Sequence, residues 1–252
     1  MIMNSNTLSI ALAQTPIVDG DIEANLKQHI RAIKQAAQQG VDLLIFPELS
    51  LSGYVLPRAE ELALDTKHSV LRELSEQAVV NQISIIAGCF LLNGTAKPTI
   101  SAVICNPTGE LGFYAKQYLH SGEEQYCKAG QHNHYLRLKG YKLALAICAD
   151  FANPQHIHDA VEDESDIYLA SALISTSGYA ADADILANIA TMYRLPVLLC
   201  NHIGQTGGWQ TAGKSAAWDT DGNMALAVED DQSCLAILEI TAGQLRGRVH
   251  LL

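Results

Sequence analysis

The stretch LALAI at residues 143–147, followed directly by Cys148 and by ADFANP at 149–154, decides the fold of this chain. An uninterrupted apolar run of this length, bounded by turn residues, is typical of a strand buried on both faces. The Asp, Asn and Pro after it predict a sharp turn into a helix that begins near Pro154. We therefore expect Cys148 at the carboxyl end of a parallel strand, where open α/β sheets bind ligands. Nearby free N–H groups at the helix start would favour a thiolate.

The sequence around this stretch has a counterpart in the first half of the chain. Three pairs of segments resemble each other: 10–15 and 143–148, 42–54 and 166–179, and 101–109 and 215–222. In each half of the chain, a helical stretch follows each of the first two segments. Further strands are expected at 83–90 and 196–201. We predict a β-α-β-α-β-β unit used twice within a single domain spanning 1–252. Two stacked sheets would give a four-layer α-β-β-α sandwich, and one doubly wound sheet is the alternative.

The spacing of apolar residues supports two of the expected helices. In the first half, apolar residues recur at helical spacing before Gly40, at Leu26, Ile30, Ile33 and Ala37. In the second half, the same spacing occurs before Pro196, at Ile185, Ile189 and Met192. Each set predicts one buried helix face, with glycine or proline ending the helix.

Composition limits the classes of partner. The 252 residues are 48% hydrophobic and carry a formal net charge of −11, so one globular domain is expected, and nucleic acid and anionic membranes are poor partners. No apolar stretch is long enough to span a bilayer. The six cysteines are scattered without a CxxC pair, and the first residues lack the basic region of a secretion signal. We therefore expect a cytoplasmic protein whose partner is a small molecule.

Two charged residues could act together with Cys148. Glu48 follows the apolar strand 43–46 and Pro47, and a carboxylate there is costly unless it ends in a polar cleft. Lys116 lies in the strand-like segment 111–119 between the two halves. A carboxylate can take a thiol proton, and a fixed ammonium can stabilise the oxyanion formed when a thiolate attacks an acyl carbon. Each residue could instead have no catalytic role. Glu48 could be a helix cap or a surface acid, Lys116 a solvated surface charge, and Cys148 a residue that only fills space in the core.

Three blocks carry a resemblance to a known family. FPEL at 46–49, YAK at 114–116 and ICAD at 147–150 resemble the signature blocks of the nitrilase superfamily, the carbon–nitrogen hydrolases. Their order and the close spacing of Lys116 and Cys148 also match. The resemblance implies an α-β-β-α fold, no cofactor, and a Glu-Lys-Cys triad formed by the Glu, Lys and Cys of the three blocks.

The resemblance also implies a fourth active-site residue, a glutamate seven residues before a glycine. Glu123 has that spacing to Gly130, while Glu124 stays open because the aromatic position of the pattern is shifted. After the nucleophile, true nitrilases commonly have Trp-Glu, and many amidases and carbamoylases have Tyr or Trp followed by Asp. Ala149 lacks the bulky side chain and Asp150 retains the acid. This departure argues against a true nitrilase and leaves the amide subclass open.

We therefore expect a cofactor-independent thiol hydrolase that cleaves the non-peptide C–N bond of a small amide. Glu48 would act as general base on Cys148, and Lys116 with the backbone N–H of Ala149 would hold the oxyanion. Glu123 would position the substrate or the lysine. Four residues after strand ends are candidate pocket walls: Tyr54, Phe151, Ser171 and Ala172.

Several alternatives stay open. Within the family they are an N-carbamoyl amide hydrolase and acyl transfer to an amine instead of water. Outside it they are a catalytically silent interaction protein that keeps the fold and a redox or metal-binding protein. Four histidines form two i, i+2 pairs, His132 with His134 and His156 with His158. That spacing shares a face on a strand but not on a helix, and we expect no metal. The resemblance implies a homodimer or a larger homo-oligomer.

Overall fold

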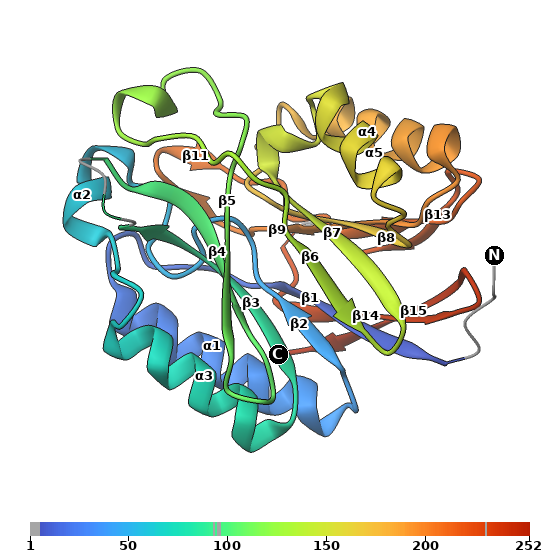
Figure 1. Ribbon diagram of the computed structural model, residues 1–252, viewed down its shortest axis with the longest axis horizontal. Coiled ribbons are helices and arrows are strands. Elements are labelled where there is room, and N and C mark those ends of the chain that lie inside the picture. The colour runs from blue at the N-terminus through green and yellow to red at the C-terminus, as the bar shows by residue number, and fades with distance from the viewer. Residues whose placement is uncertain (1–5, 93, 95–96, 230) are drawn as a thin grey trace.

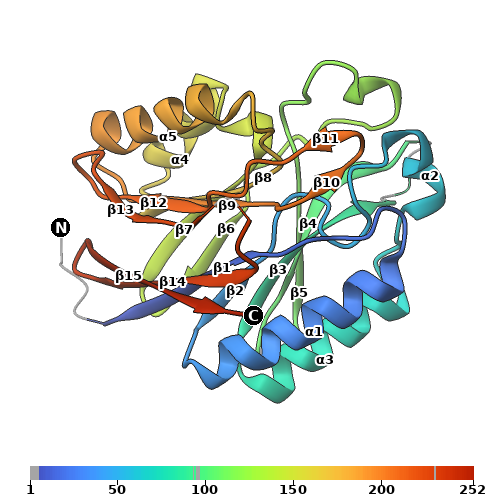
Figure 2. The same cartoon turned by 180° about the vertical axis from the view of Figure 1, so that it is seen from behind.

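The computed structural model describes residues 6–92, 94, 97–229 and 231–252. Within these residues, two large β-sheets pack face to face and carry helices on their outer faces (Figures 1 and 2). The helices of one outer layer are α1 (Ile22–Gln38) and α3 (Ser69–Asn81), and those of the other are α4 (Pro154–Glu162) and α5 (Tyr179–Tyr193). The expected four-layer sandwich is confirmed, and the alternative of one doubly wound sheet is wrong.

The first sheet has seven strands, and its central strands are parallel. In spatial order they are β15 (Gln244–Leu251), β14 (Cys234–Thr241), β1 (Leu8–Gln14), β2 (Leu43–Ile45), β3 (Ser84–Leu91), β4 (Thr99–Cys105) and β5 (Leu111–Ala115). Strands β1, β2 and β3 run parallel, with Leu12 beside Ile45 and Ile45 beside Ile86. All other neighbours in this sheet are antiparallel.

The second sheet repeats this plan with six strands. In spatial order they are β13 (Met224–Ala227), β12 (Ala216–Trp218), β9 (Val197–Asn201), β8 (Ile167–Ala172), β7 (Tyr141–Ile147) and β6 (Tyr135–Leu138). Strands β7, β8 and β9 are parallel, with Ile147 beside Ser171 and Ser171 beside Cys200, and β12 is antiparallel to β9. The orders β1-β2-β3-β4 and β7-β8-β9-β12 therefore match in chain order and strand direction, as the internal repeat predicts.

Several shorter elements lie in the connections between the strands and helices of the two sheets. They are the 3₁₀ turns η1 (Leu56–Arg58), η2 (Glu123–Gln125) and η3 (Cys148–Asp150), the short helix α2 (Ala59–Leu62), and the hairpin strands β10 (Gln205–Thr206) and β11 (Trp209–Gln210).

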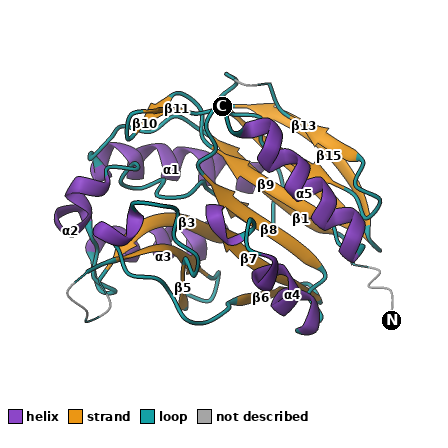
Figure 3. Ribbon diagram, turned by 90° about the horizontal axis from the view of Figure 1, so that it is seen from above, coloured by secondary structure: helices purple, strands orange, loops and turns teal. Residues whose placement is uncertain are grey.

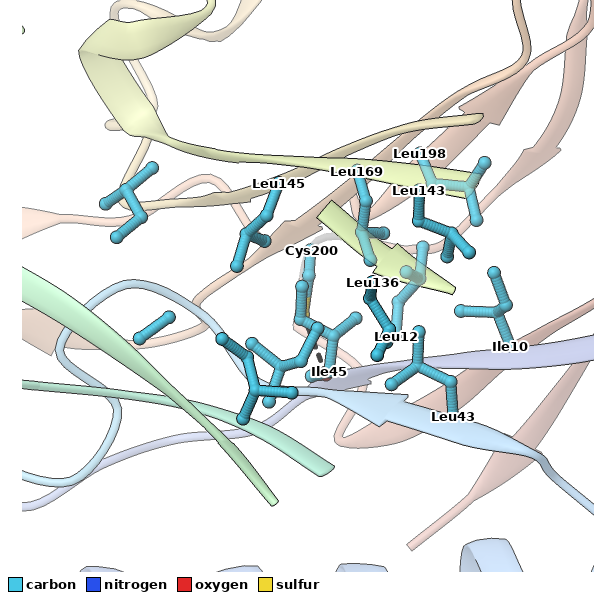
Figure 4. Close-up of a cluster of buried hydrophobic side chains, with 14 of the residues drawn as sticks. Ile10, Leu12, Leu43, Ile45, Leu136, Leu143, Leu145, Leu169, Leu198 and Cys200 are labelled. Atoms are coloured by element: carbon cyan, nitrogen blue, oxygen red, sulfur yellow. Dashed lines mark hydrogen bonds between the residues drawn. The ribbon is translucent and has the colours of Figure 1, made fainter. Parts of the chain in front are cut away.

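The main apolar core lies between the two sheets. Figure 4 shows Leu12 and Ile45 of the first sheet facing Leu145, Leu169 and Leu198 of the second. All five are buried, and burying one such side chain contributes about 1.5–3 kcal/mol. A second apolar layer fills the space under α1 and α3, and a third lies under α4 and α5, which cover the outer face of the second sheet (Figure 3). The two sheets are therefore held in a fixed relation, and so are the strand ends.

Local sequence explains where the helices begin. The Asn153 side chain accepts a hydrogen bond from the N–H of Gln155, and Pro154 occupies the first turn of α4, as the sequence predicts. In α5 one expectation was wrong, because Met192 is 72% exposed. The buried face of this helix is formed by Leu186, Ile189 and Ala190. At 3.6 residues per turn Met192 lies about 120° around the axis from Leu186, outside that face.

Two expectations concern the surroundings of the chain. The expectation that the N-terminal residues lack a secretion signal rests largely on positions 1–5, which lie outside the described residues. Among the helices that the structure describes, none combines the length and the apolar character that a membrane crossing requires.

Candidate active site

Cys148 lies directly after β7, at the carboxyl end of this strand of the second sheet. Its φ of 45° is in the left-handed region that non-glycine residues rarely adopt, and it starts the turn η3. Such strained positions cluster at functional sites. The half-buried thiol donates to the carbonyl of Leu173 at 3.6 Å and lines a pocket of about 300 Å³. The α-helix α4 begins only at Pro154, so the thiol is at the start of a short 3₁₀ turn and not at the start of an α-helix.

The environment of the Cys148 thiol favours the protonated form. Burial raises its pKa well above the ordinary range, the Glu48 carboxylate raises it further, and Lys116 only partly opposes this. The expected thiolate is therefore wrong for the resting protein. Burial and a neighbouring negative charge outweigh the N–H groups of a helix that starts several residues later.

Asp150 fixes the turn that carries the thiol. Its side chain is fully buried and accepts four hydrogen bonds. One oxygen accepts from the backbone N–H groups of Gln117 (3.0 Å) and Tyr118 (2.9 Å), and the other from the Tyr114 hydroxyl (2.6 Å) and the N–H of Ile147 (2.9 Å). The carboxylate thus ties the end of β7 to the end of β5, which are on different sheets. The sequence showed this acid but gave no indication of its partners.

Two of the histidines considered as metal ligands, His156 and His158, have separate partners. His156 is buried, and its two ring nitrogens contact the hydroxyls of Tyr114 and Tyr168, both at 2.8 Å. His158 is exposed and lies 3.7 Å from Glu162. Among the described residues, a surface group of His158, Asp159 and Glu162 places three potential ligand atoms within 4.8 Å of one another, an arrangement common on surfaces without a metal.

Lys116 lies immediately after β5 and joins two carboxylates. Its Nζ donates to Glu48 Oε1 at 2.7 Å and to Glu123 Oε1 at 2.8 Å, and all three side chains are almost completely buried. The second oxygen of Glu48 accepts from the N–H of Leu173 at 3.2 Å. The structure therefore brings Glu48, Lys116 and Glu123 together beside Cys148, although they come from separate segments. An ammonium has three donors, so one N–H of Lys116 is left for another acceptor.

The charges of this group perturb one another. Burial lowers the pKa of Lys116, but Glu48, Cys148 and Glu123 raise it by more, so the ammonium is strongly held. Burial raises the pKa of Glu48, and Lys116 only partly opposes that increase. A carboxylate with a raised pKa is a better proton acceptor than an ordinary one.

The loop that carries Glu48 depends on close backbone contacts. Gly88 of β3 lies against it, and a Cβ at this position would be 2.2 Å from the N of Leu49 and 2.7 Å from the O of Pro47. Leu49 has a φ of 52°. On the other side, His202 Nε2 donates to the carbonyl of Glu48 at 2.6 Å. These supports were not predicted from the sequence, although a glycine within a buried strand is a known signal of close backbone approach.

Glu123 and Glu124 have different environments. Glu123 is buried, accepting from the Tyr54 hydroxyl at 2.7 Å and from the N–H of His120 at 2.8 Å as well as from the lysine. Glu124 is exposed and accepts from the N–H of Gly122 at 2.8 Å. The segment is a 3₁₀ turn, and its two acids have different partners.

The pocket wall contains some of the expected residues and others that were missed. Tyr54, Ala149 and Phe151 line the pocket. Ser171 and Ala172 do not, because β8 continues through Ala172. The Ser171 hydroxyl donates to the carbonyl of Phe46, and Ala172 packs into the apolar layer under the outer helices. The wall is formed instead by residues further along the chain or in distant loops, namely His120, Ala152, Leu173, Ile174, Ser175, Gly178, Asp182 and Trp209.

Comparison with known proteins agrees with this architecture. Residues 9–247 match the model of the family described as Carbon-nitrogen hydrolase. The chain is 28% identical over 210 residues to a glutamine-dependent NAD(+) synthetase of Thermotoga maritima, covering 78% of this chain and 36% of that protein. It is 25% identical over 168 residues to omega-amidase YafV of Yersinia enterocolitica, covering 66% of this chain and 64% of that protein. The chain thus spans about one third to two thirds of the length of these curated relatives.

A solved structure shows the same fold. The amidase of Nesterenkonia sp. AN1 superposes with a TM-score of 0.85 at 22% identity, over 96% of this chain and 92% of that one. Because the family model matches nearly the whole chain, the protein belongs to the carbon–nitrogen hydrolase family. The resemblance to the carbon–nitrogen hydrolases is thereby confirmed.

Proposed function

We propose that this protein hydrolyses a small amide to an acid and ammonia through a thioester on Cys148. The observation that carries the proposal is the buried Glu48–Lys116–Glu123 group beside a strained cysteine on the wall of a 300 Å³ pocket. Burying three charges is costly, and a purely structural role would be met as well by apolar side chains. A nucleophile beside a base, with a fixed cation nearby, is the arrangement that acyl transfer needs.

The first half of the reaction forms the thioester. Glu48 accepts the Cys148 proton as the sulfur attacks the amide carbon, so no free thiolate has to exist beforehand. The carbonyl oxygen becomes an oxyanion, stabilised by the third N–H of Lys116 and by the backbone N–H of Ala149. Glu48 then returns the proton to the nitrogen, the C–N bond breaks and ammonia leaves.

The second half releases the acid. Glu48 accepts a proton from a water molecule, whose oxygen attacks the thioester carbon. The C–S bond breaks, Cys148 regains its proton, and the carboxylic acid leaves. Glu123 holds Lys116 and the Tyr54 hydroxyl in place throughout. Neither half of the reaction requires a cofactor, and Glu48 acts as the base in both.

The relatives support amide chemistry without defining the substrate. One is named an omega-amidase and another a glutamine-dependent synthetase, while the structurally similar Nesterenkonia amidase carries covalent additions at its active-site cysteine. We infer that Cys148 holds the corresponding position here.

Alkylation and turnover together test the proposal. Iodoacetamide followed by peptide mapping should modify Cys148 first, since the other five cysteines are buried, and ammonia release from amides should be lost in parallel. Cys148→Ser should fold normally and lose nearly all turnover, because a serine hydroxyl is a far weaker acid. Preferential labelling of Cys127 or Cys200 with hydrolysis intact would overturn the assignment.

The proposed unit has its own test. Glu48→Gln and Lys116→Met should each reduce the rate by several orders of magnitude, and the double variant should be little worse than either single variant. Losses that simply add would show that the two side chains act independently.

A further inference from the structure

The outer part of the pocket contains a carboxylate that the proposed mechanism does not use. Asp182 lies in the first turn of α5, lines the pocket and is only half-exposed. Its side chain has no hydrogen bond or ion pair with the residues that the structure describes, but it lies close enough to His120 for that ring partly to offset the increase in its pKa caused by burial. An acid in the first turn of a helix also interacts favourably with the helix dipole. That role, however, does not require a position facing the pocket.

Aromatic side chains complete this part of the wall. Trp209 is 47% exposed and is carried by the β10–β11 hairpin. The hairpin is held close to the segment that leads into α5, because the N–H of Thr176 donates to the carbonyl of Gln210 at 2.9 Å. It is also held against Tyr54, whose N–H donates to Thr206 Oγ1 at 2.8 Å. The pocket therefore has an indole and a phenol in its wall as well as a carboxylate.

The charges around the pocket favour a cation. Among the described residues that line it, none is an arginine or a lysine. Behind the wall, Lys116 is matched against two carboxylates, and Asp182 adds a third. His120 also lines the pocket, but its ring Nδ1 contacts the carbonyl of Ser121 at 3.2 Å. A substrate carboxylate would meet net negative charge, whereas an ammonium would find a carboxylate and aromatic faces.

We propose that Asp182 and Trp209 bind a positively charged group on the substrate, so that the protein acts on amides bearing an ammonium group in preference to monoamides of dicarboxylic acids. This rests on the proposed amide hydrolysis and names its substrate class. Asp182 would contact the ammonium through a charge-assisted hydrogen bond, and Trp209 would cover it through its ring face.

Three amides with the same three-methylene spacer test this directly. They are 4-aminobutanamide, pentanamide and the monoamide of glutaric acid, which differ in the charge at the far end. We expect kcat/KM to be highest for 4-aminobutanamide and lowest for the glutaric monoamide, each step being about tenfold. Asp182→Asn should reduce kcat/KM for 4-aminobutanamide by about ten- to a hundredfold, mainly through KM, and change that for pentanamide by less than about threefold.

Controls separate charge recognition from a general defect. Asp184→Asn removes an exposed acid from the same helix and should leave all three values unchanged within about threefold. Asp182→Lys should reverse the order and favour the glutaric monoamide. Binding to the Cys148→Ser protein, measured by calorimetry, should be tighter for 4-aminobutanamide than for pentanamide.

The outcomes distinguish this inference from the proposed function. Hydrolysis of pentanamide without a preference for 4-aminobutanamide, or an equal effect of Asp182→Asn on all three amides, would overturn the inference and leave amide hydrolysis intact. If the unmodified protein hydrolyses none of a broad amide panel, although iodoacetamide labels its Cys148 stoichiometrically, the proposed function is overturned, and this inference with it.

Discussion

Replacing Gly88 by alanine should damage the active site without touching any proposed catalytic side chain. The new Cβ would lie 2.2 Å from the N of Leu49 and 2.9 Å from the C of Glu48, and both of these atoms are backbone. Real Cβ contacts essentially never fall below 3.0 Å, so the loop must move by at least 0.8 Å. A displacement of about 1 Å at a catalytic group can cost about a hundredfold in rate. Overpacking in a well-packed core costs about 1–3 kcal/mol.

We therefore expect Gly88→Ala to reduce kcat/KM by about a hundredfold while most of the protein remains folded. For a chain of this size, each kcal/mol lowers Tm by about 2–4 °C. The assays are ammonia release and thermal unfolding. Gly112→Ala is the matched control, because a Cβ there would lie 3.3 Å from the edge of the His134 ring and 3.6 Å from Ile104 Cβ. Gly88→Ala with the activity of the control would refute the argument that β3 sets the position of Glu48.

Two further predictions concern the carboxylates. Glu123→Gln should lower the rate by at least about a hundredfold, because Glu123 holds the buried ammonium, while exposed Glu124→Gln should change it by less than about threefold. Steady-state kinetics would decide, and reversed effects would show that the fourth active-site residue has been misassigned by one position. Lowering the pH should reduce kcat/KM as Glu48 becomes protonated, and because burial raises its pKa, this limb should lie above the ordinary range of a glutamate. The apparent constant belongs to Glu48 and Cys148 together, and a limb in the ordinary carboxyl range would contradict the assignment.

The elements of the fold could be predicted because their signals are local. The apolar run 143–147 forms β7, and Asn153 with Pro154 starts α4, since strand burial and helix caps depend on neighbouring residues. The repeat of such signals predicted two similar halves. Met192 was misplaced because α5 has apolar residues on more than one face, and packing against the second sheet selects which face is buried.

The proposed catalytic residues could be nominated from the sequence, but their relation could not. Glu48, Lys116 and Cys148 follow three different strands, and only the stacking of the two sheets brings their side chains together. The protonation of Cys148 also depends on that assembly. Helix-start chemistry predicts a thiolate, whereas burial and the nearby carboxylate raise its pKa well above the ordinary range.

The pocket was the least predictable part. Asp182 and Trp209 come from a helix and a hairpin that have no local signal of shared function. Ser171 and Ala172 do not line the pocket because strand β8 extends through both of them. Periodicity, caps and turns report the backbone preferences of adjacent residues, so the sequence by itself determined the strands, the helices and the residue types available for chemistry. Distances, desolvation and the charge of the pocket arise between segments far apart in the chain, and only the tertiary structure decided them.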